Sequence, residues 1–247
     1  MSEDDHVDGN SIAAVSVAVP ETVAAAPTSL PLPLLFRKAE HSFERLDELS
    51  AEKLAQACSV TIQDFETCER FVRTLSLFSK NEEVEDISTS HLKYLLIDYY
   101  LHNLHTRVFD IDPTRRRNDI QQSLTYASKF IETCRHLKLL SREQLERWDT
   151  EIKNPHKPGT LPVQPSREAR IAAFQREKQL KEQLETLRQK QSVHDGEEMD
   201  EEDVRSLEQT KLELSINKTF TNIGMMRREL EVRSLLSLSS SSVALTL

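Results

Sequence analysis

Three side chains near the middle of the chain have a spacing that metal ligands can use. His102 and His105 are three residues apart, and Asp98 precedes His102 by about one helical turn. On a helix all three would share one face, and imidazole and carboxylate groups are ligands that zinc accepts. The spacing suggests no fourth ligand. We therefore interpret these residues as ordinary polar residues of a helix and expect no metal site.

Two arginines occupy a position that is unfavourable for a helix. Pro165 and Ser166 predict that a helix begins here, and Arg167 and Arg170 then fall in its first turn. The helix dipole disfavours exposed cations at this end by roughly 0.3–1 kcal/mol each. Both arginines share one face and lie beside a loop. This placement suggests a binding contact for Arg167 and Arg170, and the alternative is that both belong to an ordinary solvated helix face.

Basic residues also gather elsewhere, although the whole chain carries a net charge of −9. A second cluster, again in the first turn of a predicted helix, consists of Arg115, Arg116 and Arg117. In the helix that begins at Ser166, the later basic residues are expected to be solvated: Lys178, Lys181, Arg188 and Lys190. Glu177 and Lys181 are expected to form an ion pair within that helix. Nucleic-acid binding by the second cluster is the weaker interpretation, because the net charge is negative and no reading motif is present.

Sequence motifs of the common enzyme classes are missing. The sequence contains no P-loop, no G-x-G-x-x-G, no G-x-S-x-G and no H-E-x-x-H. The acidic run "NEEVED" lacks the alternating ligand spacing of a calcium loop, so we interpret it as a solvated linker. We predict a protein that is not an enzyme and that uses no cofactor.

The composition favours a helical intracellular protein. Only four of 247 residues are glycine and 30 % are charged, which argues against a β-sandwich with its frequent turns. Three cysteines form no C-x-x-C pair, and the acidic start "MSEDDHVD" is the reverse of a signal peptide. No stretch reaches the roughly 20 apolar residues that span a bilayer. We expect a cytoplasmic location, with the nucleus as a second compartment, and no membrane contact.

Apolar residues recur at steps of three or four along most of the chain. This spacing predicts helices over roughly 32–49, 50–78, 89–108, 113–137, 141–152, 167–191 and 204–233. Cys58, Cys68 and Cys134 lie on the apolar stripes, so we expect them to be buried, inert thiols. The pattern predicts an all-α fold, either an antiparallel helical bundle or a tetratricopeptide-like solenoid.

Composition also divides the chain into segments. Residues 1–29 are acidic and then rich in alanine, valine, serine and proline, which predicts a disordered tail. Residues 30–233 form the predicted helical domain, which contains a proline-rich loop at 153–165 and an acidic break at 194–203. Residues 234–247 form a low-complexity serine- and leucine-rich tail.

Four segments resemble the alpha-4 family of type-2A phosphatase-associated proteins, which are regulators linked to TOR signalling. The most specific is "NEEVEDISTSHLKYLL", within "LFSKNEEVEDISTSHLKYLLIDYYLHNL". The others are "DPTRRRNDIQQSLTYASKFI", "SREARIAAFQREKQLKEQLETL" and "DEEDVRSLEQTKLELSINKTFTNI". Together they extend over about 31–233. Members of the family continue beyond this point, so we expect a C-terminally shortened chain, a truncated or alternatively spliced product, without the ubiquitin-ligase contacts of that region.

The resemblance implies a function and a site. It implies an all-helical, tetratricopeptide-like domain that binds the catalytic subunits of protein phosphatases 2A, 4 and 6 and holds them in a protected, low-activity state. The family's phosphatase-contacting basic pair aligns with Arg167 and Arg170. Arg115, Arg116 and Arg117 are further candidates for partner contacts. We expect a monomer before binding, and the alternative is a generic helical adaptor with no phosphatase role.

Overall fold

The computed structural model describes residues 30–79, 81–108, 112–153, 166–193 and 200–244. Apart from Leu30, these residues belong to the unit Pro31–Leu247, and the predicted tail at 1–29 lies outside them. The described residues form helices and no strand, which confirms the predicted all-α fold. The predicted loop at 153–165 lies outside the described residues except for Lys153.

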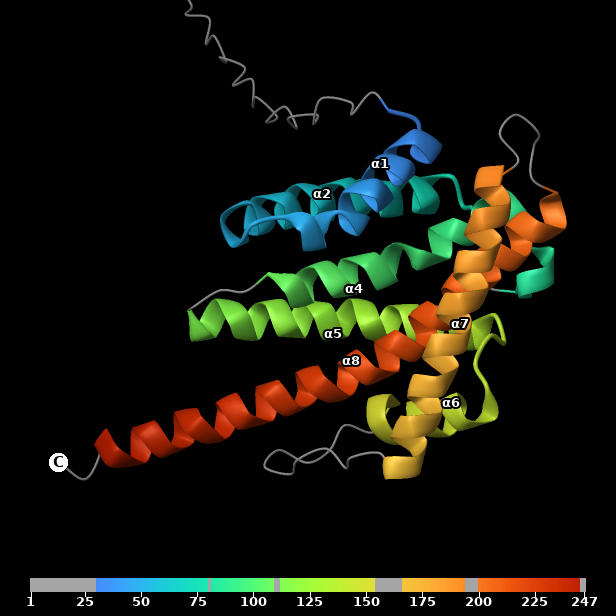
Figure 1. Ribbon diagram of the computed structural model, residues 1–247. Helices are drawn as coiled ribbons and strands as arrows, with labels where there is room; N and C mark the ends of the chain where they lie inside the picture. Colours follow the sequence, from blue (N-terminus) through green and yellow to red (C-terminus); the bar gives the residue numbers. More distant parts are fainter. Residues whose placement is uncertain (1–29, 80, 109–111, 154–165, 194–199, 245–247) are drawn as a thin grey trace, which may run out of the picture. The chain divides into compact units, whose positions relative to one another are not determined.

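Most predicted helices occur close to their expected bounds (Figure 1). The α-helices are α1 (Leu32–Glu44), α2 (Ala51–Thr74), α3 (Thr89–Leu92), α4 (Ile97–Arg107), α5 (Pro113–His136), α6 (Arg142–Arg147), α7 (Arg167–Val193) and α8 (Glu201–Ala244). Short 3₁₀ segments cover Leu46–Glu48, Val84–Asp86 and Lys93–Leu96, and a π-helical segment covers Trp148–Lys153. The predicted helix at 89–108 is therefore interrupted by a 3₁₀ turn, and the one at 141–152 ends as a π-helix.

The last helix differs most from the prediction. It begins at Glu201, inside the expected acidic break, and it continues to Ala244, beyond the expected end at 233. The predicted break ends too late, because its last residues Glu201, Glu202 and Asp203 belong to the helix. They occupy its first turn, where the helix dipole favours acidic side chains. The serine- and leucine-rich segment, whose lack of a polar face suggested no helix, is helical up to Ala244.

Consecutive long helices pack against one another. α1 packs on α2, α2 on α4, and α4 on α5, while α8 contacts both α5 and α7. Figure 1 shows α4 and α5 side by side, and α7 runs at a steep angle to both. Most positions of the predicted stripes are buried or partly buried, and the side chains of Cys58, Cys68 and Cys134 are fully enclosed. The prediction of buried thiols is confirmed.

An aromatic cluster joins the first three long helices at Tyr100. The Tyr100 ring on α4 stacks on Phe65 of α2 at 4.7 Å between centroids and meets Phe43 of α1 edge-on at 4.8 Å. Its hydroxyl donates a hydrogen bond to Glu40 at 2.9 Å. Such aromatic pairs each add about 0.5–1.5 kcal/mol beyond the buried area. The cluster fixes α1 and α2 on α4.

Two helices end in left-handed residues that are not glycine. Ser76 and Lys138 have φ angles of 50° and 57°. After each, the next amide bonds back to the helix, from Leu77 to the Val72 carbonyl and from Leu139 to the Cys134 carbonyl. These are Schellman ends. Because α2 ends at Thr74, Leu75 leaves the buried stripe that the spacing predicted and is 58 % exposed.

Candidate functional site

The first turn of α7 presents both predicted arginines to solvent. Ser166 caps the helix, because its Oγ accepts a hydrogen bond from the Ala169 amide at 3.1 Å. Arg167 and Arg170 are exposed, and neither guanidinium has a hydrogen-bond or ion-pair partner among the described residues. Between them, the backbone N–H of Glu168 and the Ser166 hydroxyl lower the pKa of the Glu168 carboxyl. The Ser166 side chain therefore takes part in forming the helix, whereas the guanidinium groups of Arg167 and Arg170 contact only solvent among the described residues.

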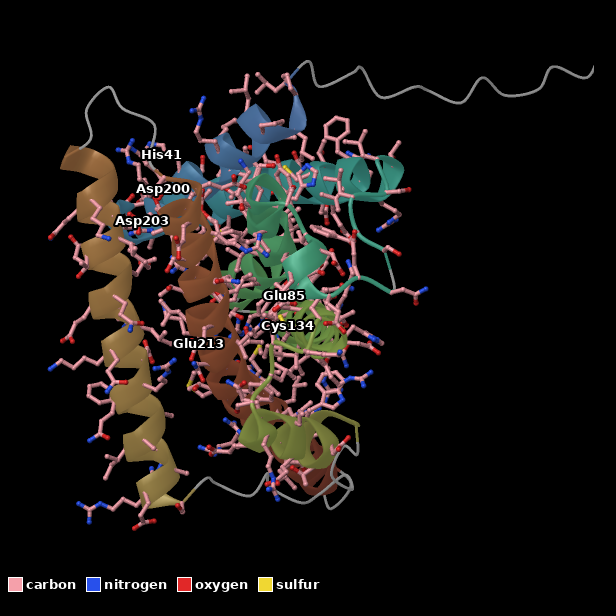
Figure 2. All side chains as sticks on the ribbon, turned by 90° about the vertical axis from the view of Figure 1, so that its right-hand side faces the viewer. His41, Glu85, Cys134, Asp200, Asp203 and Glu213 are labelled. Atoms are coloured by element: carbon pink, nitrogen blue, oxygen red, sulfur yellow. The ribbon has the colours of Figure 1, made fainter. Side chains whose placement is uncertain are left out.

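The rest of α7 is held mainly by ion pairs. Arg176 Nε donates to Glu213 Oε1 of α8 at 2.8 Å, and Leu180 is the large side chain that the helix buries fully. Figure 2 shows Asp203 and Glu213 between α7 and α8. Farther along, Arg188 pairs with Glu44 of α1 at 2.9 Å and Lys190 pairs with Asp203 at 3.2 Å.

These ion pairs correct part of the sequence interpretation. Among the described residues, Lys178 and Lys181 form their ion pairs within α7, with Glu182 at 3.8 Å and Glu177 at 2.7 Å, and both are more than half exposed. Arg188 and Lys190, in contrast, are about half exposed and connect α7 to other helices. Spacing along one helix reveals partners three or four residues away, but it cannot reveal a partner such as Glu44, which is distant in sequence.

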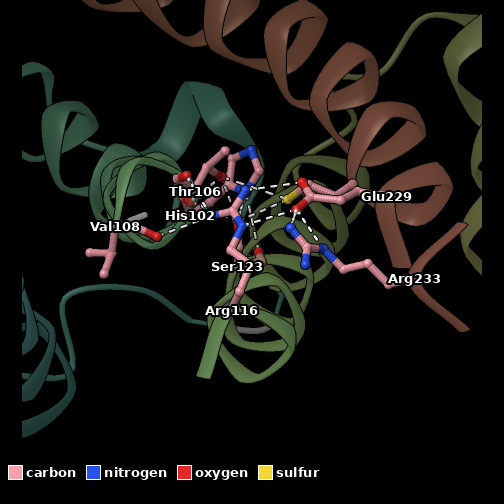
Figure 3. A network of polar contacts seen from close by, with 8 residues as sticks. His102, Thr106, Val108, Arg116, Ser123, Glu229 and Arg233 are labelled. Atoms are coloured by element: carbon pink, nitrogen blue, oxygen red, sulfur yellow. Dashed lines mark hydrogen bonds and ion pairs between the residues drawn. The ribbon is translucent and has the colours of Figure 1, made fainter. Parts of the chain in front are cut away.

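The second basic cluster divides into one buried and two exposed arginines (Figure 3). Arg116 has a side chain that is 8 % exposed, and its Nε and Nη2 each donate to the Glu229 carboxylate at 3.0 Å. Its Nη1 donates to the carbonyls of Thr106 and Val108, also at 3.0 Å. Arg116 therefore connects α5 to α8 and to the end of α4, so its guanidinium is occupied by the fold.

Arg115 and Arg117 remain on the surface. Asp112 caps α5, because its Oδ1 accepts from the amides of Thr114 and Arg115 at 2.8 and 3.4 Å. The Arg115 Nε lies 3.9 Å from the Asp112 carboxylate, and Arg117 donates to Ser234 Oγ at 3.3 Å. These two exposed arginines stay candidates for a partner contact.

Of the histidine pair, His102 serves the interior of the fold. His102 is fully buried, with Nδ1 2.9 Å from Ser123 Oγ and Nε2 3.3 Å from Asn222 Nδ2. Burial lowers the pKa of His102 to about 4. Asp98 instead pairs with Lys129 at 2.9 Å. Among the described residues, no three histidine, cysteine or acidic side chains gather as a metal site would need.

Sequence reasoning missed a groove beside Arg170. It has a volume of about 1180 Å³ and is lined by residues of α6, α7 and α8, including Arg170, Phe174 and Met225. Phe174 and Met225 are 69 % and 56 % exposed. The available sequence signal was the pair Ile171 and Phe174, two large apolar residues three positions apart near the start of a mostly polar helix.

Within the described part of the chain, no helix is both long enough and apolar enough to cross a lipid bilayer.

The packed helices define an all-α protein that presents an exposed arginine pair at the first turn of α7. The chain matches the TAP42-like family over residues 32–241 and belongs to it. It is 29 % identical to the rice protein named PP2A regulatory subunit TAP46, over 82 % of this chain and 50 % of that protein. It is 28 % identical to a Caenorhabditis elegans protein named serine/threonine-protein phosphatase 4 regulatory subunit ppfr-4, over 66 % of this chain and 49 % of that protein.

A solved structure of the Tap42 alpha4 subunit has the same fold. Its TM-score is 0.63 at 22 % sequence identity, and the match covers 83 % of this chain and all of the solved chain. The chain spans about half the length of the curated relatives it matches.

Proposed function

We propose that this chain is a regulatory subunit that binds the catalytic subunits of type-2A protein phosphatases through the first turn of α7. Membership of the TAP42-like family and the names of the rice and nematode relatives support this role. The observation that carries the proposal is the exposed pair Arg167 and Arg170. Neither has a partner among the described residues, although the helix dipole disfavours both.

The chemistry of the pair predicts what it binds. The planar guanidinium group can engage a carboxylate through two parallel hydrogen bonds, so the partner surface carries aspartate or glutamate. Removing one side of a desolvated, hydrogen-bonded charge pair costs roughly 2–5 kcal/mol. Because about 1.4 kcal/mol corresponds to a factor of ten, loss of both arginines weakens binding at least tenfold.

The proposal includes the scope of the regulation. The partners are the catalytic subunits of protein phosphatases 2A, 4 and 6, which the chain holds in a protected, low-activity state within TOR-linked signalling. The chain itself is not an enzyme, is a monomer before binding, and acts in the cytoplasm and the nucleus. The predicted segments at 1–29 and 234–247 contribute little to binding, and residues 30–233 carry it.

The test compares two charge reversals of equal size. Arg167→Glu with Arg170→Glu is measured against purified catalytic subunits by titration, and we expect binding to fall at least tenfold without loss of helicity. The control is Arg37→Glu with Lys53→Glu, which alters the net charge equally at exposed residues of α1 and α2. Equal loss in both variants that fades with salt would indicate long-range steering alone.

Two other results would redirect the proposal. Normal binding by the Arg167 and Arg170 variant would move the contact elsewhere, with Arg115 and Arg117 as the next residues to reverse. If the unaltered chain captured no catalytic subunit, the generic adaptor would be the better description and the proposed function would be wrong.

A further inference from the structure

Two partly buried lysines of α8 differ in the charges around them. Lys211 Nζ lies 3.3 Å from the Glu40 carboxylate of α1 and 3.0 Å from that of Glu208. Burial alone would lower the pKa of Lys211, but these two carboxylates raise it above its ordinary value. Lys218 lies two turns farther along the same side of α8, and it has no hydrogen-bond or ion-pair partner among the described residues. Because buried ammonium groups are normally paired, Lys218 departs from the usual arrangement.

The charged groups that act on Lys218 come from α4 and α7. Arg107 of α4 pairs with Asp47 at 2.7 Å, and Lys181 of α7 pairs with Glu177 at 2.7 Å. Burial is the main reason why the pKa of Lys218 is lowered. The charges of Lys181 and Arg107 lower that pKa further, whereas the charge of Glu177 opposes them. Three cations therefore share this region, and both of its carboxylates are engaged by the other two.

The position of Lys218 on α8 accounts for its burial. Leu214 and Ser215, which lie one turn before it, are 7 % and 6 % exposed, so protein covers this face of the helix. Tyr99 of α4 forms a hydrogen bond with Ser215 on the same face. Lys218 itself stays partly exposed, so a small molecule in solution can reach it. Poor solvation and neighbouring cations both disfavour the ammonium form, so the neutral amine is favoured.

We propose that Lys218 is an acylation site, at which the ε-amine accepts an acyl group from a thioester. The Nζ lone pair attacks the thioester carbonyl carbon, a C–N bond forms, the C–S bond breaks, and the thiol leaves with the proton that the amine gives up. Only the neutral amine can attack, and a lysine whose surroundings disfavour the ammonium form supplies more of it near neutral pH. The amide product is uncharged, so the repulsion from Lys181 and Arg107 disappears. Because α7 packs on α8, acylation holds α7 more firmly in place.

Acetylation of the full chain by acetyl-coenzyme A, with no enzyme added, tests this reactivity directly. Peptide mass spectrometry gives the acetylated fraction at each lysine, and Lys211 is the matched control because it is also partly buried on the same side of α8. At pH 8 we expect Lys218 to react roughly tenfold faster than Lys211 or more, since one unit of pKa changes the neutral fraction by a factor of ten. Equal rates at the two lysines, or no acetylation of Lys218, would overturn the proposal.

The pH dependence of the same reaction separates basicity from access. We expect the Lys218 rate to reach half of its maximum below the ordinary lysine pKa of about 10.4, and the Lys211 rate above it. Lys181→Gln should move the Lys218 midpoint to higher pH, because it removes a cation and frees Glu177. Lys178→Gln is the control, since Lys178 is an exposed residue of α7 that pairs with Glu182. An equal response to both variants, or to neither, would refute the role of the neighbouring cations.

The stability of the fold should report the loss of charge as well. Lys218→Gln has a neutral side chain, as the acylated residue does, and we expect it to raise the melting temperature at pH 7. A lysine whose pKa is lower in the folded state destabilises the fold below that pKa, and this penalty is lost as the pH rises toward the unfolded pKa. The gain from Lys218→Gln should therefore shrink with rising pH. A melting temperature at pH 7 that is lower for Lys218→Gln than for Lys218→Arg, which keeps the charge, would contradict the proposal.

Discussion

Replacement of Arg116 by alanine should destabilise the fold more than any other change in the second basic cluster. The residue donates four hydrogen bonds, two to the Glu229 carboxylate of α8 and two to carbonyls at the end of α4. The Thr106 carbonyl belongs to the last turn of α4, where no amide of the helix can satisfy it. Arg116→Ala therefore removes the ion pair between α5 and Glu229 of α8 together with a cap on the end of α4.

The size of the effect follows from the burial of the two partners. Removing one member of a buried ion pair costs about 3–5 kcal/mol. The lower end applies here, because the Glu229 side chain is 31 % exposed and keeps its bond to Arg233 at 3.0 Å. We expect a loss of about 3 kcal/mol in the free energy of unfolding. For a domain of about 200 residues this lowers the melting temperature by roughly 6–12 °C.

Urea unfolding followed by circular dichroism at pH 7 measures this free energy. Arg117→Ala is the control, because Arg117 is exposed and a change there should stay within about 0.5 kcal/mol. Arg116→Lys keeps the charge but loses the planar fork, so it should lie between the two. A cost below about 1 kcal/mol for Arg116→Ala would show that the four bonds contribute little and would refute the argument.

The same pair predicts a pH dependence. The hydrogen bond from Arg116 lowers the pKa of Glu229 below its ordinary value. A carboxyl whose pKa is lower in the folded state stabilises the fold above the unfolded pKa, and this stabilisation is lost as the pH falls through the folded pKa. The difference in unfolding free energy between the unaltered chain and Glu229→Gln should therefore be full at pH 7 and shrink in acid. A difference that stays constant down to pH 3 would contradict this explanation.

Other residues supply further predictions. His102 has its pKa lowered to about 4 by burial, so the fold should lose roughly 3 kcal/mol as the pH falls from 6.5 to 4, and His102→Gln should flatten that slope in urea titrations. Burial raises the pKa of Cys68 to about 12 and that of Cys134 further. Both thiols should therefore react slowly with a thiol reagent in the native state and rapidly in urea. Fast labelling in the native state would contradict the burial of these stripes. Ser76→Gly should raise the free energy of unfolding by about 1 kcal/mol, because glycine adopts the left-handed C′ conformation without the Cβ clash. An unchanged melting temperature would show that Ser76 is not strained.

Apolar spacing predicted the helices well because burial drives their formation. The apolar stripe of α5 is an example, since Ile120, Ala127, Ile131 and Cys134 recur at helical spacing and are nearly or fully buried, whereas Leu124 of the same stripe is partly buried. The spacing of apolar residues does not show which backbone carbonyl each amide hydrogen-bonds to. The 3₁₀ turn at Lys93–Leu96 and the π-helix at Trp148–Lys153 therefore could not be predicted. In α8, by contrast, the acidic first turn was a readable signal for a helix start.

The second basic cluster shows what a list of charges misses. Its three consecutive arginines carry the same side chain and charge. Only Arg116 lies four residues before Ile120, and it therefore falls on the buried face of α5. Helical periodicity could therefore have indicated that Arg116 needs an internal partner. It could not have identified Glu229, which is more than a hundred residues away in sequence. The partner became known only through the packing of α8 on α5.

The same reasoning separates Arg167 and Arg170 from Arg116, Arg176 and Arg188. Arg116, Arg176 and Arg188 each neutralise a carboxylate on another helix, so their charges have a role in folding. Arg167 and Arg170 have none among the described residues, and the dipole of α7 opposes both. Arg167→Ala and Arg170→Ala should therefore leave the melting temperature unchanged or slightly raised. A fall of several degrees would mean that the pair serves the fold, which would remove the main argument for a partner at this turn.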